Sequence, residues 1–246
     1  MQPAPDSLER LVPDALDAHD TTGRATLELH LARYAFAALH LRPGRALDIA
    51  CGVGYGTRLL AERGGGALRV VGVDVSAAAV AHAREHYGGA GVEYRVCDAL
   101  AFEDPEGFDT IVSLETVEHV PEPELLIGRL VGLLRPGGVL VASVPTTPSV
   151  DLNPHHRHDF TERSFRGLAA GHGLTEQGCL RQVQPVSVTS VLRRSEARMG
   201  DLRAGLPRYY ASHPRALLRR IGATLRHGFS NRYLTVAWRS PKEVGT

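Results

Sequence analysis

Short apolar runs with the character of β-strands alternate with helix-like runs between residues 46 and 144. The strand-like runs are ALDIA (46–50), RVVGVD (69–74), VEYRV (92–96), FDTIVS (108–113) and GVLVASV (138–144). Helical periodicity lies between them at 57–62, 78–86 and 123–134. Because helices that connect parallel strands cover both faces of a sheet, this alternation predicts an α/β fold built on one largely parallel sheet.

The flanking segments extend this core. A helix is expected at Thr26–Leu39, before the first strand, and a long polar loop at 145–160, where three prolines and three histidines occur. A helix over 161–172 and a strand near 176–184 follow. A basic helical segment and a closing strand are expected after them, at 187–229 and 232–240.

No long linker interrupts the 246 residues, so we expect one domain over 1–246. Its expected parts are an N-terminal helical cap, a core, a helical insertion and a last strand, at 1–45, 46–184, 185–230 and 231–240.

Composition excludes several classes of protein. No run approaches about 18 consecutive apolar residues, so no membrane span is expected. The first 20 residues are acidic and lack an apolar centre, which does not fit a secretory signal. The three cysteines cannot all pair with one another and form no CxxC motif. These features predict a protein of the reducing cytoplasm.

Charge is distributed unevenly along the chain. Residues 187–246 contain 12 Lys and Arg but 3 Asp and Glu, whereas the whole chain has a net charge of only +1. A solvated helix face is the simplest explanation. A lid, a homodimer contact, and a basic amphipathic helix on a membrane surface or anionic polymer are the alternatives. Aromatic residues make up 6% of the chain and no RNA-binding motif is present, so nucleic acid is not favoured as a partner.

A glycine-rich loop follows the first strand. It places Gly52, Gly54 and Gly56 between Asp48 and a helix, where glycine allows close approach of a ligand to backbone N–H groups. The spacing is GxGxG, and Thr57 stands where a dinucleotide-binding GxGxxG motif would have its last glycine. A nucleoside ligand other than NAD or FAD is therefore favoured.

Acidic residues end the next two strands. Asp74 lies 22 residues after Gly52, where a carboxylate can accept hydrogen bonds from a ribose diol. Asp98 ends the third strand, where it can accept an amino proton of adenine. The carboxyl ends of parallel strands meet at one edge of the sheet, so these groups are expected to line one crevice.

In order, the motifs ALDIACGVGYGTRLLA, VVGVDVS, VCDAL, FDTIVSLETVEHV and LLRPGGVLVASVP resemble those of class I S-adenosylmethionine (AdoMet)-dependent methyltransferases. The resemblance implies a Rossmann-like, seven-stranded mixed sheet of order 3-2-1-4-5-7-6 with strand 7 antiparallel, AdoMet as cofactor and S-adenosylhomocysteine as product. It assigns Asp48, Gly52 and Gly54 to the methionine part, Asp74 to the ribose and Asp98 to the adenine. The full expected cofactor set is Tyr34, Asp48, Ala50, Gly52, Gly54, Asp74, Val75, Asp98 and Ala99. Ala50 departs from the glycine of many members but is also small.

A carboxylate–histidine group follows the fourth strand. If the chain turns helically after Ser113, Glu115, Glu118 and His119 share one face. Two carboxylates so placed repel unless a cation lies between them, and a hard ion such as Mg²⁺ is suitable. The alternative is structural: Glu115 only borders the cofactor, and Glu118 and His119 cap the next helix.

Three histidines follow the fifth strand. The ExxEH motif with a later histidine is similar to small-RNA 2′-O-methyltransferases and to O-methyltransferases of ubiquinone biosynthesis, which implies a divalent metal. A further likeness, to related bacterial proteins with N-P-x-H-x-x-E-F after strand 5, implies that His156 is the fourth metal ligand, after Glu115, Glu118 and His119, with Asp159 in the acidic position. His155 and His158 are then candidates for general base or substrate contact. The expected catalytic set is Glu115, His119 and His155.

The reaction expected is transfer of a methyl group to a hydroxyl, because a hydroxyl must lose its proton with the help of a metal or a base, whereas an amine or carbon acceptor would not need the metal. The helix that carries Glu28, His30, Arg33 and Tyr34 is expected to fold over the cofactor and to line the acceptor pocket. The sequence of this helix is similar to that of bacterial methyltransferases of sugar and polysaccharide biosynthesis. The expected acceptor is a small molecule or glycan, with a sugar slightly ahead of a phenol or quinone precursor. An RNA 2′-O-methyltransferase that acts on a terminal ribose and a non-enzymatic AdoMet-binding partner subunit are the alternatives.

Overall fold

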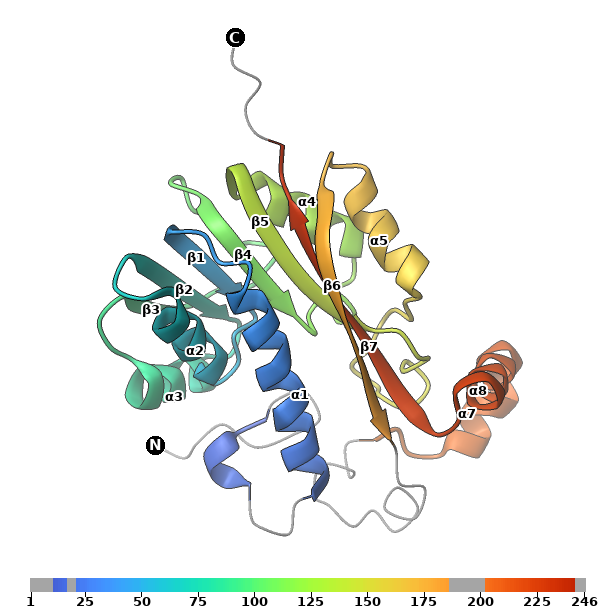
Figure 1. Ribbon diagram of the computed structural model, residues 1–246. Helices are drawn as coiled ribbons and strands as arrows, with labels where there is room; N and C mark the ends of the chain where they lie inside the picture. Colours follow the sequence, from blue (N-terminus) through green and yellow to red (C-terminus); the bar gives the residue numbers. More distant parts are fainter. Residues whose placement is uncertain (1–10, 17–20, 186–201, 242–246) are drawn as a thin grey trace.

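A seven-stranded sheet forms the centre of the molecule (Figure 1). The computed structural model describes residues 11–16, 21–185 and 202–241. The strands are β1 (Gly44–Ile49), β2 (Leu68–Asp74), β3 (Val92–Val96), β4 (Phe108–Leu114), β5 (Leu134–Pro145), β6 (Thr175–Pro185) and β7 (Ser230–Arg239). Their order is β3-β2-β1-β4-β5-β7-β6, and β7 runs antiparallel to both of its neighbours. The predicted fold class, strand order and direction are confirmed.

Helices cover both faces of this sheet (Figure 1). They are the short 3-10 turn η1 (Pro13–Ala15) and the α-helices α1 (Thr21–Ala38), α2 (Tyr55–Gly64), α3 (Ala77–Tyr87), α4 (Pro123–Gly132), α5 (Glu162–Ala170), α7 (Leu206–Ser212) and α8 (Pro214–His227). The expected basic segment is thus helical in its described part, and its residues 186–201 lie outside the described residues, as do residues 1–10 and 17–20 of the expected cap.

Alternation along the central strands produces two hydrophobic layers. On β4, Ile111 packs with α4 and α5, whereas its neighbour Val112 packs with α1 and α2. Successive side chains of a strand point to opposite faces, so a continuous apolar run supplies both layers. Burial of β4 and β5 between the layers fixes the sheet that positions the site.

The carboxyl ends of the parallel strands meet at the lower end of the sheet in Figure 1. The loop after β5 spans the stretch from Pro145 to Glu162 without a helix or strand, as expected. Helices begin again where the sequence offers caps: Ser76 Oγ accepts from Ala79 N at 3.2 Å, and Thr161 forms a capping box with Ser164. In the part of the chain that the structure describes, no helix combines the length and apolar character needed to cross a bilayer.

Candidate functional site

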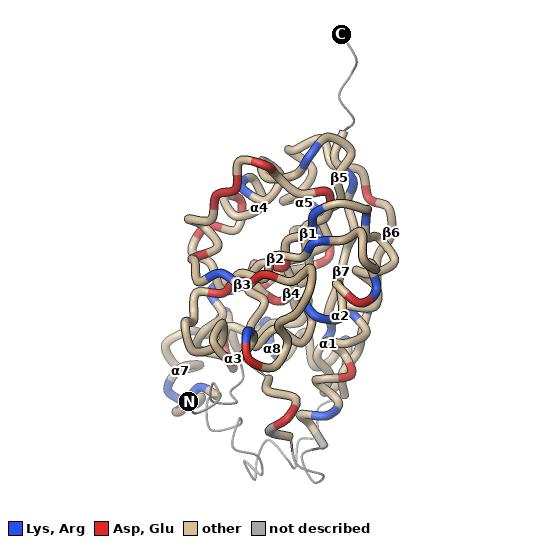
Figure 2. The backbone as a smooth tube through the Cα atoms, turned by 90° about the vertical axis from the view of Figure 1, so that its left-hand side faces the viewer, with Lys and Arg blue, Asp and Glu red and all other residues tan. Residues whose placement is uncertain are grey.

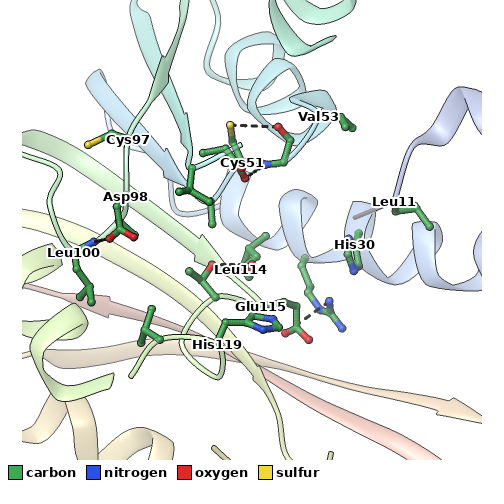
Figure 3. A pocket seen from close by; sticks show the side chains of 18 of the residues that line it. Leu11, His30, Cys51, Val53, Cys97, Asp98, Leu100, Leu114, Glu115 and His119 are labelled. Atoms are coloured by element: carbon green, nitrogen blue, oxygen red, sulfur yellow. Dashed lines mark hydrogen bonds and ion pairs between the residues drawn. The ribbon is translucent and has the colours of Figure 1, made fainter. Parts of the chain in front are cut away.

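A cavity of about 380 Å³ opens at this carboxyl edge, between α1 and the loops after β1 to β4 (Figure 3). The predicted residues that line it are Tyr34, Ala50, Gly52, Asp74, Val75, Asp98, Ala99, Glu115 and His119. Residues far apart in the sequence therefore meet at one crevice, as the topology predicts.

Left-handed backbone shapes the loop after β1. Ala50, Gly52 and Gly54 have φ of 59°, 58° and 94°. A Cβ at Gly54 would lie 2.6 Å from the Cβ of Ala83 and 2.8 Å from the Tyr94 hydroxyl, so only glycine fits there. Ala50 adopts the same left-handed backbone conformation although it has a Cβ, which makes that conformation unfavourable. Strain is thus concentrated where the loop approaches the cavity.

Asp74 joins this loop to the next strand. Its Oδ2 accepts from Gly52 N at 2.9 Å, and its Oδ1 accepts from Ser76 N at 2.8 Å. These bonds fix the carboxylate at the cavity wall at the end of β2. Such a carboxylate can accept from a ribose diol.

Neither Asp48 nor Gly54 is among the residues that line the cavity. The carboxylate of Asp48 is 1% exposed and accepts from Thr57 Oγ1 at 2.6 Å and from the Tyr34 hydroxyl at 3.2 Å. Burial raises the pKa of Asp48 to about 7. The structure therefore gives Asp48 a role in holding the loop against α1, which differs from the direct ligand contact expected from sequence.

Asp98 ends β3 at the other side of the cavity. Its Oδ1 accepts from Leu100 N at 2.7 Å, which leaves the second carboxylate oxygen for a ligand. Cys97, Ala99 and Leu100 line the cavity beside it. An apolar slot with one carboxylate at its edge suits a purine that donates through an amino group.

Helix α1 supplies two cavity residues that were absent from the expected site set. Arg33 is 1% exposed: Nε donates to Gln182 Oε1 at 2.8 Å, and the guanidinium lies 4.3 Å from the centroid of the Tyr233 ring. His30 Nδ1 lies 2.8 Å from the Tyr55 hydroxyl, and burial lowers the pKa of His30 to about 3. The sequence indicated this helix as part of the pocket wall. Only its packing distinguishes the inward residues.

Glu115 occupies a turn. Its φ is 50°, and His119 N donates to Thr116 O at 3.1 Å, so residues 115–119 do not form the helical face proposed for them. The Ser143 hydroxyl donates to Glu115 Oε1 at 2.6 Å, and Arg33 Nη1 lies 3.7 Å from the same oxygen. The carboxylate thus pairs with a cation that the protein itself supplies.

Three of the four predicted metal ligands come together. Among the described residues, Glu118, His119 and His156 form a group whose ligand atoms all lie within 4.8 Å of one another, and Glu115 is not a member of it. Glu118 is fully buried, with Oε1 at 3.9 Å from His119 Nε2. The His119 and His156 rings meet edge to face with centroids 4.7 Å apart.

Hydrogen bonds orient both imidazoles. His119 Nδ1 lies 3.3 Å from the backbone oxygen of His155, and His156 Nδ1 lies 2.7 Å from Ser149 Oγ. Because a carbonyl oxygen can only accept, Nδ1 of His119 carries the proton of this hydrogen bond. Burial lowers the pKa of His156 to about 3, so that ring is neutral. A buried carboxylate beside two oriented imidazoles fits a divalent metal.

The other histidines of this loop have structural contacts. The side chain of His155 is exposed and does not line the cavity, so only its backbone oxygen reaches the site. His158 Nε2 lies 3.1 Å from Val120 O. Asp159 Oδ1 accepts from Ser149 N at 2.8 Å and from Val150 N at 3.1 Å. These contacts differ from the expected base and acidic-ligand roles: His158 contacts the backbone of the segment after β4, and Asp159 contacts the backbone of its own loop.

With this geometry in place, comparison with known families gives a direct match. The family described as "Methyltransferase domain" matches residues 47–142, which contain the glycine loop, Asp74, Asp98 and the Glu118–His119 pair. This core is a class I AdoMet-dependent methyltransferase domain.

Known relatives extend the comparison beyond the family match. A ubiquinone biosynthesis O-methyltransferase of Pseudomonas fluorescens (strain SBW25) is 34% identical over 139 residues, which are 50% of this chain and 59% of that protein. The chain thus spans less than two thirds of the length of this relative.

Solved structures share the fold at lower identity. N-methyltransferase NodS from Bradyrhizobium japonicum WM9, in complex with S-adenosyl-L-homocysteine, aligns over 92% of this chain and 90% of its own, with a TM-score of 0.58 and 18% identity. The [4+2]-cyclase SpnF aligns over 93% and 86%, with a TM-score of 0.61 and 20% identity. Proteins named for different reactions therefore share this fold, and the acceptor must be argued from the site.

Proposed function

We propose that the chain is an AdoMet-dependent O-methyltransferase that uses a divalent cation. The observation that carries this proposal is the group of Glu118, His119 and His156 at the edge of the cavity that Asp74 and Asp98 line. His119 belongs to both the group and the cavity wall. A cation in the group would therefore adjoin any acceptor placed beside the methyl donor.

The cofactor is proposed to lie along the carboxyl edge of the sheet. Asp74 would accept from the ribose hydroxyls, and Asp98 from the adenine amino group. The backbone of the loop at Ala50 and Gly52 would lie against the methionine part. Methyl transfer is an in-line displacement at carbon, so alignment of donor and acceptor by these walls contributes much of the acceleration.

An oxygen acceptor follows from the donor set. A bound divalent cation would lower the pKa of a coordinated hydroxyl and orient it. Glu118 would neutralise part of the metal charge, while the backbone carbonyl of His155 would keep His119 Nε2 directed to the metal. The sequence predicted Mg²⁺, which prefers oxygen ligands, whereas two imidazoles also suit transition metals. Metal identity is therefore one arm of the test.

The acceptor we propose is a hydroxyl on a small molecule that carries a second, neighbouring oxygen. A vicinal diol of a sugar and a catechol both meet this requirement. The relatives named for ubiquinone biosynthesis favour the phenolic class, and nothing in the comparisons supports the slight preference for sugars taken from sequence. A catechol is therefore the first probe.

The test uses radiolabelled AdoMet with a catechol probe, and in parallel with a soluble extract of the native host. The chelator-treated protein receives Mg²⁺, Mn²⁺, Zn²⁺ or excess EDTA, and label is counted in organic, small aqueous and macromolecular fractions. Metal-dependent label in a small-molecule fraction is the expected result. Undiminished label in EDTA would refute the metal. Label in RNA would support the terminal-ribose alternative, and absence of label with AdoMet bound would support the partner subunit.

A further inference from the structure

Helix α8 presents its apolar side chains to solvent. Leu218, Ile221 and Leu225 recur along one face of this helix, and Phe229 follows just beyond its end. Their exposed fractions are 68%, 46%, 84% and 62%. A surface helix ordinarily turns its apolar stripe to the core, so α8 has the reverse orientation. Four large apolar residues on one short segment form a patch that calls for a covering surface.

The inner face of α8 explains how the helix is held in this orientation. Ala216 is buried, and one turn later Arg220 Nε donates to Asp151 Oδ2 at 2.8 Å while its Nη2 bonds the Pro148 carbonyl. The Tyr210 hydroxyl of α7 donates to the same carboxylate oxygen at 2.7 Å. Asp151 is 3% exposed, so this is a buried ionic anchor. The polar face is thereby fixed inward and the apolar stripe outward.

The segment that carries the stripe has one sign of charge along the chain. No Asp or Glu occurs from residue 202 to 241, whereas eight arginines do. Of these, Arg215, Arg219 and Arg226 lie on α8 and are exposed. Arg219 Nη1 also lies 3.5 Å from Asp159 Oδ2. Figure 2 marks Lys and Arg in blue and Asp and Glu in red along the backbone. A partner for this helix must therefore cover the apolar side chains and also neutralise the positive charge of the arginines.

We propose that α8 docks in the interface of an anionic phospholipid bilayer. Acyl chains would cover Leu218, Ile221 and Leu225, and lipid phosphates would pair with the flanking arginines. A second copy of this chain would bring the same arginines against themselves, which opposes pairing of two stripes. A nucleic acid would satisfy the charge but leave the aliphatic side chains exposed. Of these three occupants, only the bilayer meets both requirements.

This docking would place the site at the bilayer. The loop that Arg220 binds, from Pro148 to Asp151, also holds Ser149, whose hydroxyl contacts His156. In Figure 1, α7 and α8 lie beside the lower end of the sheet, where the parallel strands end. The inference rests on these contacts and on the stripe, and it holds whether or not the proposed reaction is correct.

The test is sedimentation of the full chain with vesicles of phosphatidylcholine alone, or of phosphatidylcholine with 30% phosphatidylglycerol, in about 0.1 M and 0.5 M salt. We expect binding to the anionic vesicles that falls at least tenfold in high salt. The double variant Leu218→Ser/Leu225→Ser should lower the partition coefficient about tenfold or more. Arg215→Gln/Arg226→Gln should lower it about tenfold on anionic vesicles.

Matched controls separate docking from general surface effects. Leu39→Ser changes a leucine that is 82% exposed outside α8, and Arg63→Gln changes an arginine in the last turn of α2; both should bind as wild type does. No binding to any vesicle, or equal binding to both vesicle types, would overturn the proposal. So would a dimer in ultracentrifugation that Leu225→Ser dissociates, or displacement of the protein from vesicles by a short RNA at equal charge.

Discussion

His119 donates its Nδ1 proton to the backbone oxygen of His155, 3.3 Å away, while its Nε2 lies 3.9 Å from Glu118 Oε1. One residue of the loop after β5 thus sets the tautomer of a residue in the turn after β4. The neighbour of His155, His156, completes the group from the same loop. The loop therefore both supplies a ligand and orients another.

We predict that His119→Ala lowers the turnover number by about 100-fold or more and changes the dissociation constant of AdoMet less than about threefold. The variant removes one ring of the proposed metal group, whereas Asp74 and Asp98, on other strands, are unaffected. Rates with labelled AdoMet and calorimetric titration of the cofactor measure the two quantities. His155→Ala is the control, because its backbone oxygen remains; a comparable loss in that variant would contradict the assignment.

The Asp74→Asn variant should weaken AdoMet binding by roughly 10- to 100-fold. The amide retains one acceptor oxygen but loses the charge that strengthens hydrogen bonds from a ribose diol. Titration at constant salt measures the dissociation constant, and a thermal melt checks that the loop around Gly52 remains folded. Glu62→Gln, an exposed change on α2, is the control. Unchanged affinity for AdoMet in Asp74→Asn would refute the ribose contact.

Because of Asp48, the free energy of unfolding should fall as pH rises. Its pKa is about 7 in the folded state against an ordinary value of 3.8, so the folded chain keeps a proton that the unfolded chain releases. The contribution of this proton to the free energy of unfolding is fully present below about pH 4 and is lost as pH rises through 7. Denaturant unfolding of wild type and Asp48→Asn at pH 5 and pH 8 measures this. We expect a smaller loss of unfolding free energy in the variant; equal losses would contradict the raised pKa.

Ala50→Gly should raise the free energy of unfolding by about 0.5–1 kcal/mol. Alanine at a φ of 59° pays a steric cost that glycine avoids, and the gain exceeds the extra entropy of the unfolded glycine. Chemical denaturation at pH 6 measures the change. Ala61→Gly, inside α2, should have the opposite sign by about 1 kcal/mol. Destabilisation by Ala50→Gly would show that the loop relies on alanine packing.

Much of the fold could be read from local pattern. The strand expected at 92–96 is β3 to the residue, and the helix expected at 78–86 is α3 with one residue more at each end. These elements follow from periodicity and caps that are local in sequence. The strand expected at 138–144 was too short, because β5 begins at Leu134. There Leu134 pairs with Phe108 of β4, and the register of the two strands shifts between Phe108 and Thr110. Such pairing depends on a distant strand.

The candidate site divides in the same way. Glycine spacing and strand-end acids pointed to the loop after β1, to Asp74 and to Asp98, and all three lie at one cavity. The position of Glu115 could not be read from its spacing. Arg33 from α1 and Ser143 from β5 reach its carboxylate. Residues 115–119 form a turn instead of the helix that the spacing suggested, so Glu115 does not share a face with Glu118 and His119.

The sequence by itself determined the order of strands and helices along the chain, the position of the glycine loop and which strands end in an acidic residue. Each of these depends on neighbours within a few residues. Tertiary structure alone decided which polar groups meet. Asp48 turns to Tyr34 and Thr57, the backbone of His155 orients His119, and Asp151 holds α8 with its leucines outward. The physical reason is that burial makes each polar group find a partner, and that partner is chosen by packing across the sheet rather than by distance along the chain.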